Sequence, residues 1–300
     1  MDRLPDFLLI GAAKAGTTAL AQMLSQHPDL FFAPNKEPSF FAWMGQSLDV
    51  QGPGDWEVLS PYVVSNWEAY RRQFEGAAAA AVVGEASTAY LYHPLAAARI
   101  AEYLPQVRLI AILRQPAERA YAAYWHLRRD GRETLDFAAA LQAEPGRIAG
   151  GWEQLWHYRQ MGYYAAQLQR YLAHFERGRL YVCLYDDFQA DAAATAQGIF
   201  RFLGVDAGFT PRVALSTNRG GLPRLAWLYR LLAGGRVKGM GRRWAAAGLR
   251  RCARRVLDAW PVRKPSFDPD LRAALTGEYR DDILRLQEML QRDLSVWLQG

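Results

Sequence analysis

The 300-residue sequence has little cysteine, little lysine and no long apolar run. Its two cysteines, Cys183 and Cys252, lie far apart and outside any Cys-x-x-Cys or Cys/His cluster, which argues against a disulfide framework or a structural zinc site. The first apolar stretch, residues 7–10, is too short for a signal-peptide core or a membrane span. The sequence therefore predicts a cytoplasmic protein without a transmembrane segment, in which both thiols are buried and reduced.

The sequence also lacks internal repeats and low-complexity linkers. The absence of a repeat period of about 20 to 50 residues excludes solenoids and propellers. With 51% apolar residues the chain can bury a large core. We therefore expect a single domain over residues 1–300.

Apolar runs alternate with helical patterns along the chain. Buried strands are expected at residues 7–10, 81–84, 108–113 and 180–185, and helices at 17–26, 163–175, 192–203 and 268–291. Pro94 and Pro116 lie near the starts of further helices, and Gly204 is a plausible helix end. This order predicts an α/β fold with a central parallel sheet flanked by helices and a helical C-terminal part.

Basic residues gather in one segment near the C-terminus. Residues 224–264 contain twelve Lys and Arg and a single acid, Asp258, which gives +11 against +6 for the whole chain. Such a segment is either a solvated helical surface or a face for an anionic partner. Trp227, Trp244 and Trp260 interleave with it, so a non-catalytic module for acidic glycans, nucleic acid or a membrane surface is one hypothesis.

A turn of small residues joins the first expected strand to the first helix. Gly11 and Gly16 have the spacing of the Walker motif GxxxxGK[ST], but Thr17 stands where that motif has lysine. Such a turn aims backbone N–H groups and a helix N-terminus at an anion, which predicts a phosphate site in a P-loop-like three-layer fold. The lysine, Lys14, lies inside the loop, where it can reach an oxygen that bridges two phosphorus-like centres. A Mg²⁺-dependent kinase with an altered P-loop stays open as an alternative.

Lysine is rare enough that its positions carry information. Four of the 36 basic residues are lysine, and two of these, Lys14 and Lys36, fall in the first two motifs. Residues 9–20 resemble the 5'-phosphosulfate loop of sulfotransferases that use 3'-phosphoadenosine 5'-phosphosulfate (PAPS) and release adenosine 3',5'-bisphosphate (PAP), in particular the heparan-sulfate, carbohydrate-type and bacterial members. The resemblance implies that the 5'-phosphosulfate is bound by Lys14, Ala15, Gly16, Thr17 and Thr18.

A second segment, residues 114–124, resembles the family's 3'-phosphate motif, in which an Arg and a downstream Ser hold the donor's 3'-phosphate. Arg114 matches the Arg, whereas Ala122 stands at the Ser position. Arg219 and Gly220 fall where relatives close a basic loop over the same phosphate. Arg219 is therefore a candidate to replace the missing Ser, and a weaker grip or another residue are the alternatives.

The stretch Leu184-Tyr185-Asp186-Asp187-Phe188 is similar to a family element whose Tyr lies against the adenine. Tyr185 is therefore expected either to contact the donor's base or to be a core aromatic at the end of a strand.

The segment Lys36-Glu37-Pro38-Ser39-Phe40-Phe41 resembles the Lys-Glu-x-x-Phe-Phe segment of heparan-sulfate and other Golgi-type carbohydrate sulfotransferases. In those enzymes the Glu is the catalytic base. The resemblance implies that Glu37 takes the proton of the acceptor and that Lys36 lies at the acceptor. Ser39 stands where some relatives carry a histidine.

Residues 84–90 resemble the family's Ser-Pro-x-Tyr stretch, which lines the acceptor cleft, although the Pro is absent. Ser87 and Tyr90 are therefore expected at the acceptor. His93 is a second candidate base, because the cytosolic aryl and steroid sulfotransferases use histidine for that step.

Together these motifs predict in-line transfer of the sulfuryl group from PAPS to a hydroxyl or amine of a carbohydrate or small-molecule acceptor. No metal is expected, and the remaining histidines have no metal-ligand spacing: His27, His126, His157 and His174. The basic segment leaves an acidic or glycosylated acceptor open, and nucleic acid is not expected as a partner.

Overall fold

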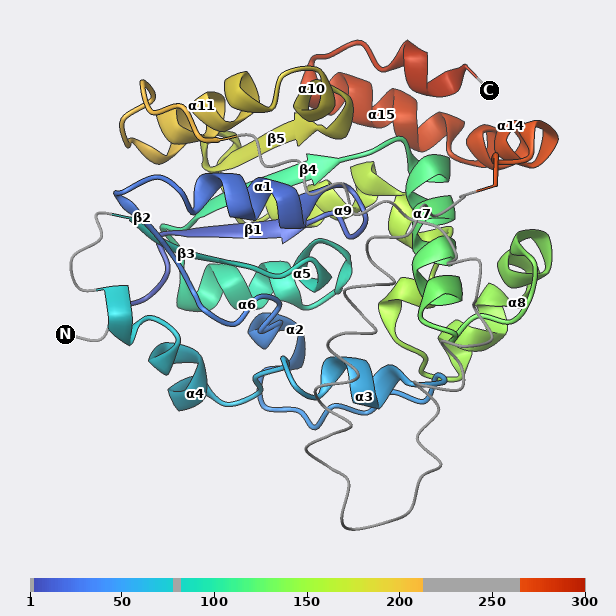
Figure 1. The fold of residues 1–300 in the computed structure, drawn as a ribbon, viewed down its shortest axis with the longest axis horizontal. Coiled ribbons are helices and arrows are strands. Elements are labelled where there is room, and N and C mark those ends of the chain that lie inside the picture. The colour runs from blue at the N-terminus through green and yellow to red at the C-terminus, as the bar shows by residue number, and fades with distance from the viewer. Residues whose placement is uncertain (1–2, 78–81, 213–264, 300) are drawn as a thin grey trace.

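The computed structural model of the chain describes residues 3–77, 82–212 and 265–299 (Figure 1). Three of the features singled out in the sequence lie outside these ranges: Cys252, the Arg219-Gly220 pair and the basic segment 224–264.

Five parallel strands form the central sheet in the order β2-β3-β1-β4-β5. The strands are β1 (Phe7–Gly11), β2 (Leu30–Phe32), β3 (Val82–Ala86), β4 (Arg108–Leu113) and β5 (Leu180–Leu184). Leu9 in the central strand pairs with Ala86 on one side and Ile110 on the other. Every residue of β1 is buried, as expected for a parallel strand covered on both faces.

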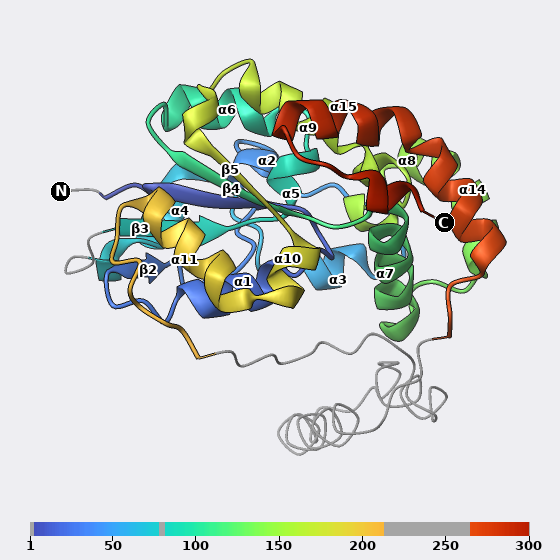
Figure 2. The same ribbon diagram turned by 90° about the horizontal axis from the view of Figure 1, so that it is seen from above.

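Helices cover both faces of this sheet (Figures 1 and 2). One face carries α1 (Thr17–Leu24), α10 (Tyr185–Ala190) and α11 (Ala192–Leu203). The other carries α5 (Ala89–Tyr92), α6 (Ala96–Tyr103) and α9 (Tyr164–Leu172), with α15 (Arg280–Leu290) packed on α9. The α/β fold with a central parallel sheet that the sequence predicts is therefore confirmed.

The strands point toward a group of helices beyond their carboxyl ends (Figure 1). This group consists of α7 (Pro116–Arg129), α8 (Phe137–Ala149) and α14 (Pro269–Glu278). Between β2 and β3 the chain forms three short helices, α2 (Phe40–Trp43), α3 (Asp55–Leu59) and α4 (Trp67–Arg72). The loops that follow the strands consequently meet at one edge, which is where open α/β sheets bind their ligands.

Several helix boundaries follow from local sequence, and one does not. Pro116 is the first residue of α7, and Gly204 ends α11 with φ 77°. The helical run predicted over residues 268–291 is present, but it is divided at Tyr279 into α14 and α15. The Tyr279 ring packs where a side chain on Gly162 would lie, and the break lets α14 reach α7 while α15 lies on α9.

No helix in the described ranges is long and apolar enough to cross a bilayer. Within the same ranges, no group of three or more His, Cys, Asp or Glu side chains is arranged to hold a metal ion. Cys183 is buried in β5, where burial raises the pKa of its thiol to about 12.

Candidate active site

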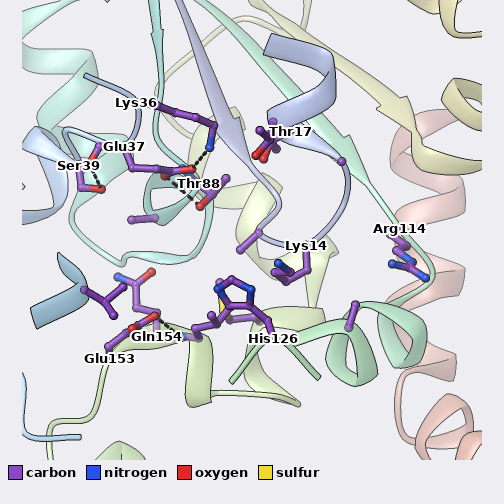
Figure 3. A pocket seen from close by; sticks show the side chains of 18 of the residues that line it. Lys14, Thr17, Lys36, Glu37, Ser39, Thr88, Arg114, His126, Glu153 and Gln154 are labelled. Atoms are coloured by element: carbon purple, nitrogen blue, oxygen red, sulfur yellow. Dashed lines mark hydrogen bonds and ion pairs between the residues drawn. The ribbon is translucent and has the colours of Figure 1, made fainter. Parts of the chain in front are cut away.

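A cavity of about 640 Å³ opens at the carboxyl edge of the sheet (Figure 3). The residues that follow all five strands contribute to its wall. Among the motif residues singled out in the sequence it is lined by Lys14, Gly16, Thr17, Thr18, Lys36, Glu37, Ser39, Arg114, Ala122 and Tyr185. The fold thus brings the predicted donor-loop residues and the predicted base to one cavity from widely separated parts of the chain.

The loop after β1 has the geometry of an anion site. Lys14 and Gly16 both have positive φ, 68° and 96°, and a Cβ on Gly16 would lie 3.0 Å from the Tyr185 ring, so glycine is required there on two grounds. Helix α1 begins at Thr17 without a side-chain cap, so the N–H groups of its first turn are free to meet a ligand. Ala15 does not line the cavity, since it is fully buried and its N–H donates to the Ala12 carbonyl at 3.2 Å.

Positive charge converges around Lys14. Burial, followed by the charge of Arg129, lowers the pKa of Lys14 to about 8, although Asp130 opposes this shift. His126 lies beside Lys14 on the cavity wall (Figure 3), and burial together with the charges of Lys14 and Arg129 lowers its pKa to about 2. The imidazole is therefore neutral at physiological pH, and this part of the cavity favours an anion that would relieve the mutual repulsion of its cations.

Arg114 forms the far end of the cavity (Figure 3). Its guanidinium carbon lies 4.9 Å from the centre of the Tyr185 ring, and its Nη2 lies 3.4 Å from Glu118 Oε2. Glu118 also accepts from Arg272 Nε of α14 at 3.1 Å. Ala122 lines the wall one helical turn beyond Glu118, so the position where relatives carry a Ser borders the cavity but presents only a methyl group.

Glu37 is held firmly, with its carboxylate on the cavity wall. Its Oε2 accepts from the Thr88 N–H at 2.6 Å and from the Thr88 hydroxyl at 3.1 Å, while Lys36 Nζ lies 2.6 Å from its Oε1. The Glu37 N–H donates to the Ala86 carbonyl at 2.9 Å. These contacts fix a carboxylate opposite Lys14, where it can accept a proton (Figure 3).

Two residues expected at the acceptor lie behind the cavity instead. Ser87 and Tyr90 are fully buried, and their hydroxyls donate to the carboxylate of Glu85 at 2.7 and 2.6 Å. The chain turns from β3 into α5 at this point, which directs both side chains into the core. As the structure stands, neither can contact an acceptor directly.

His93 lies apart from Glu37. It lines a neighbouring cavity of about 490 Å³ that shares Trp43, Glu153 and Gln154 with the first. Burial, followed by the charge of Arg99, lowers the pKa of His93 to about 4.

A row of cavity residues on α7 was not predicted from the sequence. Trp125, His126 and Arg129 follow Ala122 at spacings of three and four residues, so they share one face of the helix. Helical spacing from Ala122 is the signal that could have found them.

A second missed feature is an ion-pair cluster on the cavity wall. Arg132 pairs with Asp55 and with Glu153, the latter at 2.8 Å, and Asp55 also accepts from Trp156 Nε1 at 2.8 Å. The three charged residues are far apart in sequence, and only the folded chain brings them together.

These observations agree with comparison to known proteins, in which the model of the sulfotransferase family matches residues 5–211. The chain belongs to the sulfotransferase family. The crystal structure of a sulfotransferase from Alicyclobacillus acidocaldarius is similar with a TM-score of 0.78 and 34% identity, covering 98% of this chain and 99% of that one. The family inferred from the loop and the Lys-Glu motif is therefore confirmed, and the chain is an enzyme of the sulfotransferase class.

Two larger animal proteins are also similar to this sulfotransferase. The bifunctional heparan sulfate N-deacetylase/N-sulfotransferase 4 of Mus musculus is 26% identical over 99% of the chain. The bifunctional heparan sulfate N-deacetylase/N-sulfotransferase 2 of Homo sapiens is 28% identical over 97% of it. The chain spans only 31% and 30% of the length of these relatives.

Proposed function

We propose that this sulfotransferase moves the sulfuryl group of PAPS to a hydroxyl or amine of a carbohydrate or small-molecule acceptor. The observation that carries the proposal is the convergence of Lys14, Glu37 and Arg114 on one cavity from the ends of three strands. The cavity's volume of about 640 Å³ lies within the range of about 300–1,000 Å³ common for small-molecule sites.

The donor is proposed to lie along the wall from Lys14 to Tyr185. The N–H groups of the first turn of α1 and the Thr17 and Thr18 hydroxyls would hold the 5'-phosphosulfate, and Arg114 the 3'-phosphate. Tyr185, which closes on Gly16, would lie against the adenine. Arg219, the proposed substitute for the Ser missing at Ala122, stays a prediction from the sequence.

The chemistry is a single in-line displacement at sulfur. The acceptor oxygen or nitrogen forms a bond to sulfur while the bond from sulfur to the bridging oxygen breaks, and PAP leaves with that electron pair. Lys14 would neutralise the charge that develops on the leaving oxygen, and Glu37 would take the acceptor's proton. Most of the catalysis would come from positioning and charge stabilisation, as in phosphoryl transfer.

The names of the mouse and human relatives, which are bifunctional heparan sulfate N-deacetylase/N-sulfotransferases, support a carbohydrate acceptor and include an amine among the proposed nucleophiles. The shared wall of Trp43, Glu153 and Gln154 supports the same view, since aromatic and polar side chains together suit a sugar.

Thermal denaturation tests the donor assignment, with PAP added in the presence of EDTA and ATP added with Mg²⁺ in EDTA-free buffer. PAP at about 100 times its dissociation constant should raise the melting temperature by about 5 °C, since it stabilises the folded state by about 2.7 kcal/mol. ATP with Mg²⁺ should leave the melting temperature unchanged. Lys14→Ala should abolish the shift, whereas Glu37→Gln should keep the shift and lose turnover. A shift with ATP and Mg²⁺ but none with PAP would support the kinase alternative instead.

A further inference from the structure

A buried carboxylate lies directly behind the loop that carries Glu37. Glu85, near the end of β3, is fully buried and accepts three hydroxyl hydrogen bonds, from Tyr90 at 2.6 Å, Tyr70 at 3.3 Å and Ser87 at 2.7 Å. Within the described part of the chain, no Lys, Arg or His pairs with it. A buried carboxylate held only by neutral donors is unusual, because buried acids are normally paired with a cation.

One of these hydroxyls connects Glu85 to the Glu37 loop. The Ser87 hydroxyl donates to Glu85 Oε2 and accepts from the Ser39 N–H at 2.9 Å. Glu37 and Ser39 both have positive φ, 70° and 50°, a conformation that non-glycine residues adopt only when their surroundings enforce it. The Ser87 contact is therefore one of the constraints that keep the Glu37 turn in shape.

The other two hydroxyls connect Glu85 to the helix that follows the loop. The Tyr70 ring stacks on Phe40 with ring centres 4.4 Å apart, and the Tyr90 ring packs edge-on against Phe41 at 5.7 Å. Phe40 and Phe41 begin α2 immediately after Ser39. Glu85 therefore accepts hydrogen bonds from residues that contact two neighbouring segments. One segment is the turn that carries Glu37, and the other is helix α2, which follows the turn.

We propose that Glu85 is a positioning residue for Glu37 and acts through Ser87. Because Glu85 accepts the Ser87 proton, the Ser87 oxygen presents a lone pair to the Ser39 N–H and holds Ser39 in its left-handed conformation. Glu37 then keeps its carboxylate on the cavity wall, where Thr88 fixes it. The inference rests on the proposed function, since it requires Glu37 to be the base.

A matched pair of variants separates positioning from general packing. Ser87→Ala and Tyr70→Phe each remove one hydroxyl that donates to Glu85, but only the Ser87 hydroxyl also accepts from Ser39. Turnover is followed as PAP release from PAPS, with the best acceptor of a panel of oligosaccharides, alkyl glycosides and phenols. Ser87→Ala should lower kcat by about 100-fold, the effect of a small misplacement of a catalytic group. Tyr70→Phe should lower it by less than about threefold.

Two further readouts distinguish positioning from damage to the fold. The dissociation constant for PAP, measured by calorimetry, should stay within about twofold of wild type in both variants, because the donor wall is untouched. Amide exchange at Ser39 should speed up by about tenfold or more in Ser87→Ala and not in Tyr70→Phe. Ser87→Cys, which keeps the side chain's shape but accepts hydrogen bonds only weakly, should show part of the effects of Ser87→Ala and serves if that variant is unstable.

A double-mutant cycle gives the decisive outcome. If Ser87 acts through Glu37, Ser87→Ala should cause no further loss of kcat in a Glu37→Gln background. Equal losses in the two backgrounds, unchanged Ser39 exchange, or equal kcat values for Ser87→Ala and Tyr70→Phe would each overturn the inference. If Glu37→Gln itself keeps wild-type kcat, the proposed base fails. By contrast, if Glu37→Gln is inactive and Ser87→Ala keeps wild-type kcat, Glu37 stands as the base and only the positioning role of Glu85 fails.

Discussion

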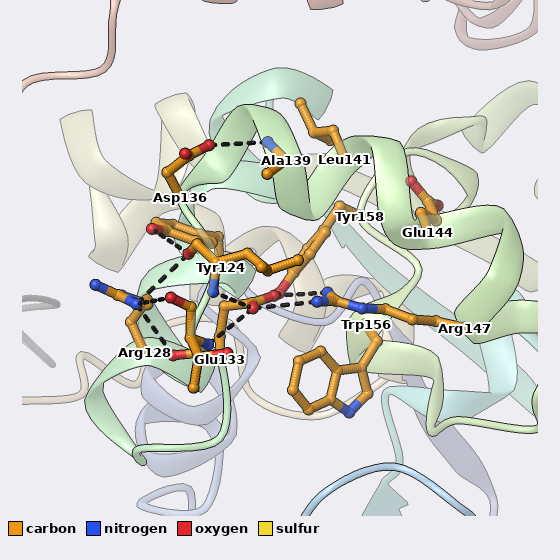
Figure 4. Close-up of polar contacts among 12 residues, drawn as sticks. Tyr124, Arg128, Glu133, Asp136, Ala139, Leu141, Glu144, Arg147, Trp156 and Tyr158 are labelled. Carbon is orange, nitrogen blue, oxygen red and sulfur yellow. Dashed lines mark hydrogen bonds and ion pairs between the residues drawn. The ribbon is translucent and has the colours of Figure 1, made fainter.

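Glu85 and Glu133 are two buried carboxylates that differ in their hydrogen-bond donors. Glu133 is 1% exposed and accepts two hydrogen bonds from Arg147, at 2.6 and 3.1 Å, one from Tyr158 and two from the Thr134 and Leu135 N–H groups (Figure 4). Among the described residues, Glu85 accepts side-chain hydrogen bonds only from three neutral hydroxyl groups.

The pKa values of the two groups move in opposite directions for this reason. Burial raises the pKa of Glu85 to about 7, and its three hydroxyl donors only partly counter that effect. Burial also opposes ionisation of Glu133, but the hydrogen bonds from Arg147, the Leu135 N–H and Tyr158, together with the Arg147 charge, hold its pKa below the usual value. Glu133 is part of a satisfied ion pair that joins α8 to the loop between α7 and α8, whereas Glu85 lies behind the turn in which Glu37 and Ser39 have positive φ.

The largest effect is expected when the satisfied pair is broken. Glu133→Gln leaves the Arg147 guanidinium buried without a counter-ion and should lower the free energy of unfolding by about 3–5 kcal/mol. Urea denaturation measures this loss. The double variant Glu133→Leu, Arg147→Met should recover part of it, because it removes both charges at once. A loss below about 1 kcal/mol in Glu133→Gln would show that the pair does not carry the stability assigned to it.

The two carboxylates should also give opposite pH dependences of stability. Above pH 4.5 the Glu85 carboxyl is mostly ionised in the unfolded chain, whereas in the folded chain it stays mostly protonated up to about pH 7. The free energy of unfolding should therefore fall by about 3 kcal/mol as the pH rises through this window, and Glu85→Gln should lack this slope. Glu133, with a lowered pKa, should instead lose its contribution only as the pH falls below 4.5. Parallel wild-type and Glu85→Gln curves would contradict the raised pKa.

Lys14 is a buried cation whose neighbours are also cationic, so its pKa is lowered where that of Glu85 is raised. With a pKa of about 8, it is mostly protonated at pH 7 and mostly neutral at pH 9. PAP affinity should therefore fall by about tenfold between these pH values, since the anion prefers the charged amine. Calorimetric titration measures the fall. Lys14→Arg should flatten the curve, because arginine stays protonated throughout, and an equally steep curve in that variant would assign the titration to another group.

The smallest effect is expected at a partly exposed pair. Arg272 and Glu118 lie 3.1 Å apart with side chains 29% and 27% exposed. Arg272→Ala should change the free energy of unfolding by less than about 1 kcal/mol, as is common for solvent-screened pairs. A loss as large as that of Glu133→Gln would mean that the packing of α14 depends on this contact. It would also mean that solvent exposure does not explain the difference in stability between buried and partly exposed ion pairs.

Local sequence predicted four of the five strands, since long apolar runs form them, and residues such as Pro116 and Gly204 limit the helices. The three-residue strand β2 and the short helices α2, α3 and α4 were not predicted, because their sequences are too short for a clear pattern. The break at Tyr279 could not be predicted, because it depends on a contact with Gly162, which is distant in sequence.

The site also divides into residues that local sequence predicts and residues that only contacts between distant segments bring into place. Lys14, Glu37, Arg114 and Tyr185 belong to contiguous motifs and were predicted to lie at the site, and the fold brings all four to one cavity. The burial of Ser87 and the Arg132 cluster could not be predicted, because the direction of a side chain and the pairing of distant charges are fixed only by the tertiary fold.

Transfer from radiolabelled PAPS tests the proposed function most directly. Wild-type protein in EDTA should move label from PAPS to at least one carbohydrate, phenol or amine acceptor. Glu37→Gln should bind PAP with wild-type affinity and transfer at least about 100-fold less label, as expected when a general base is lost. Equal transfer by Glu37→Gln, or PAP binding without label transfer to any acceptor, would contradict the proposed reaction and the role given to Glu37.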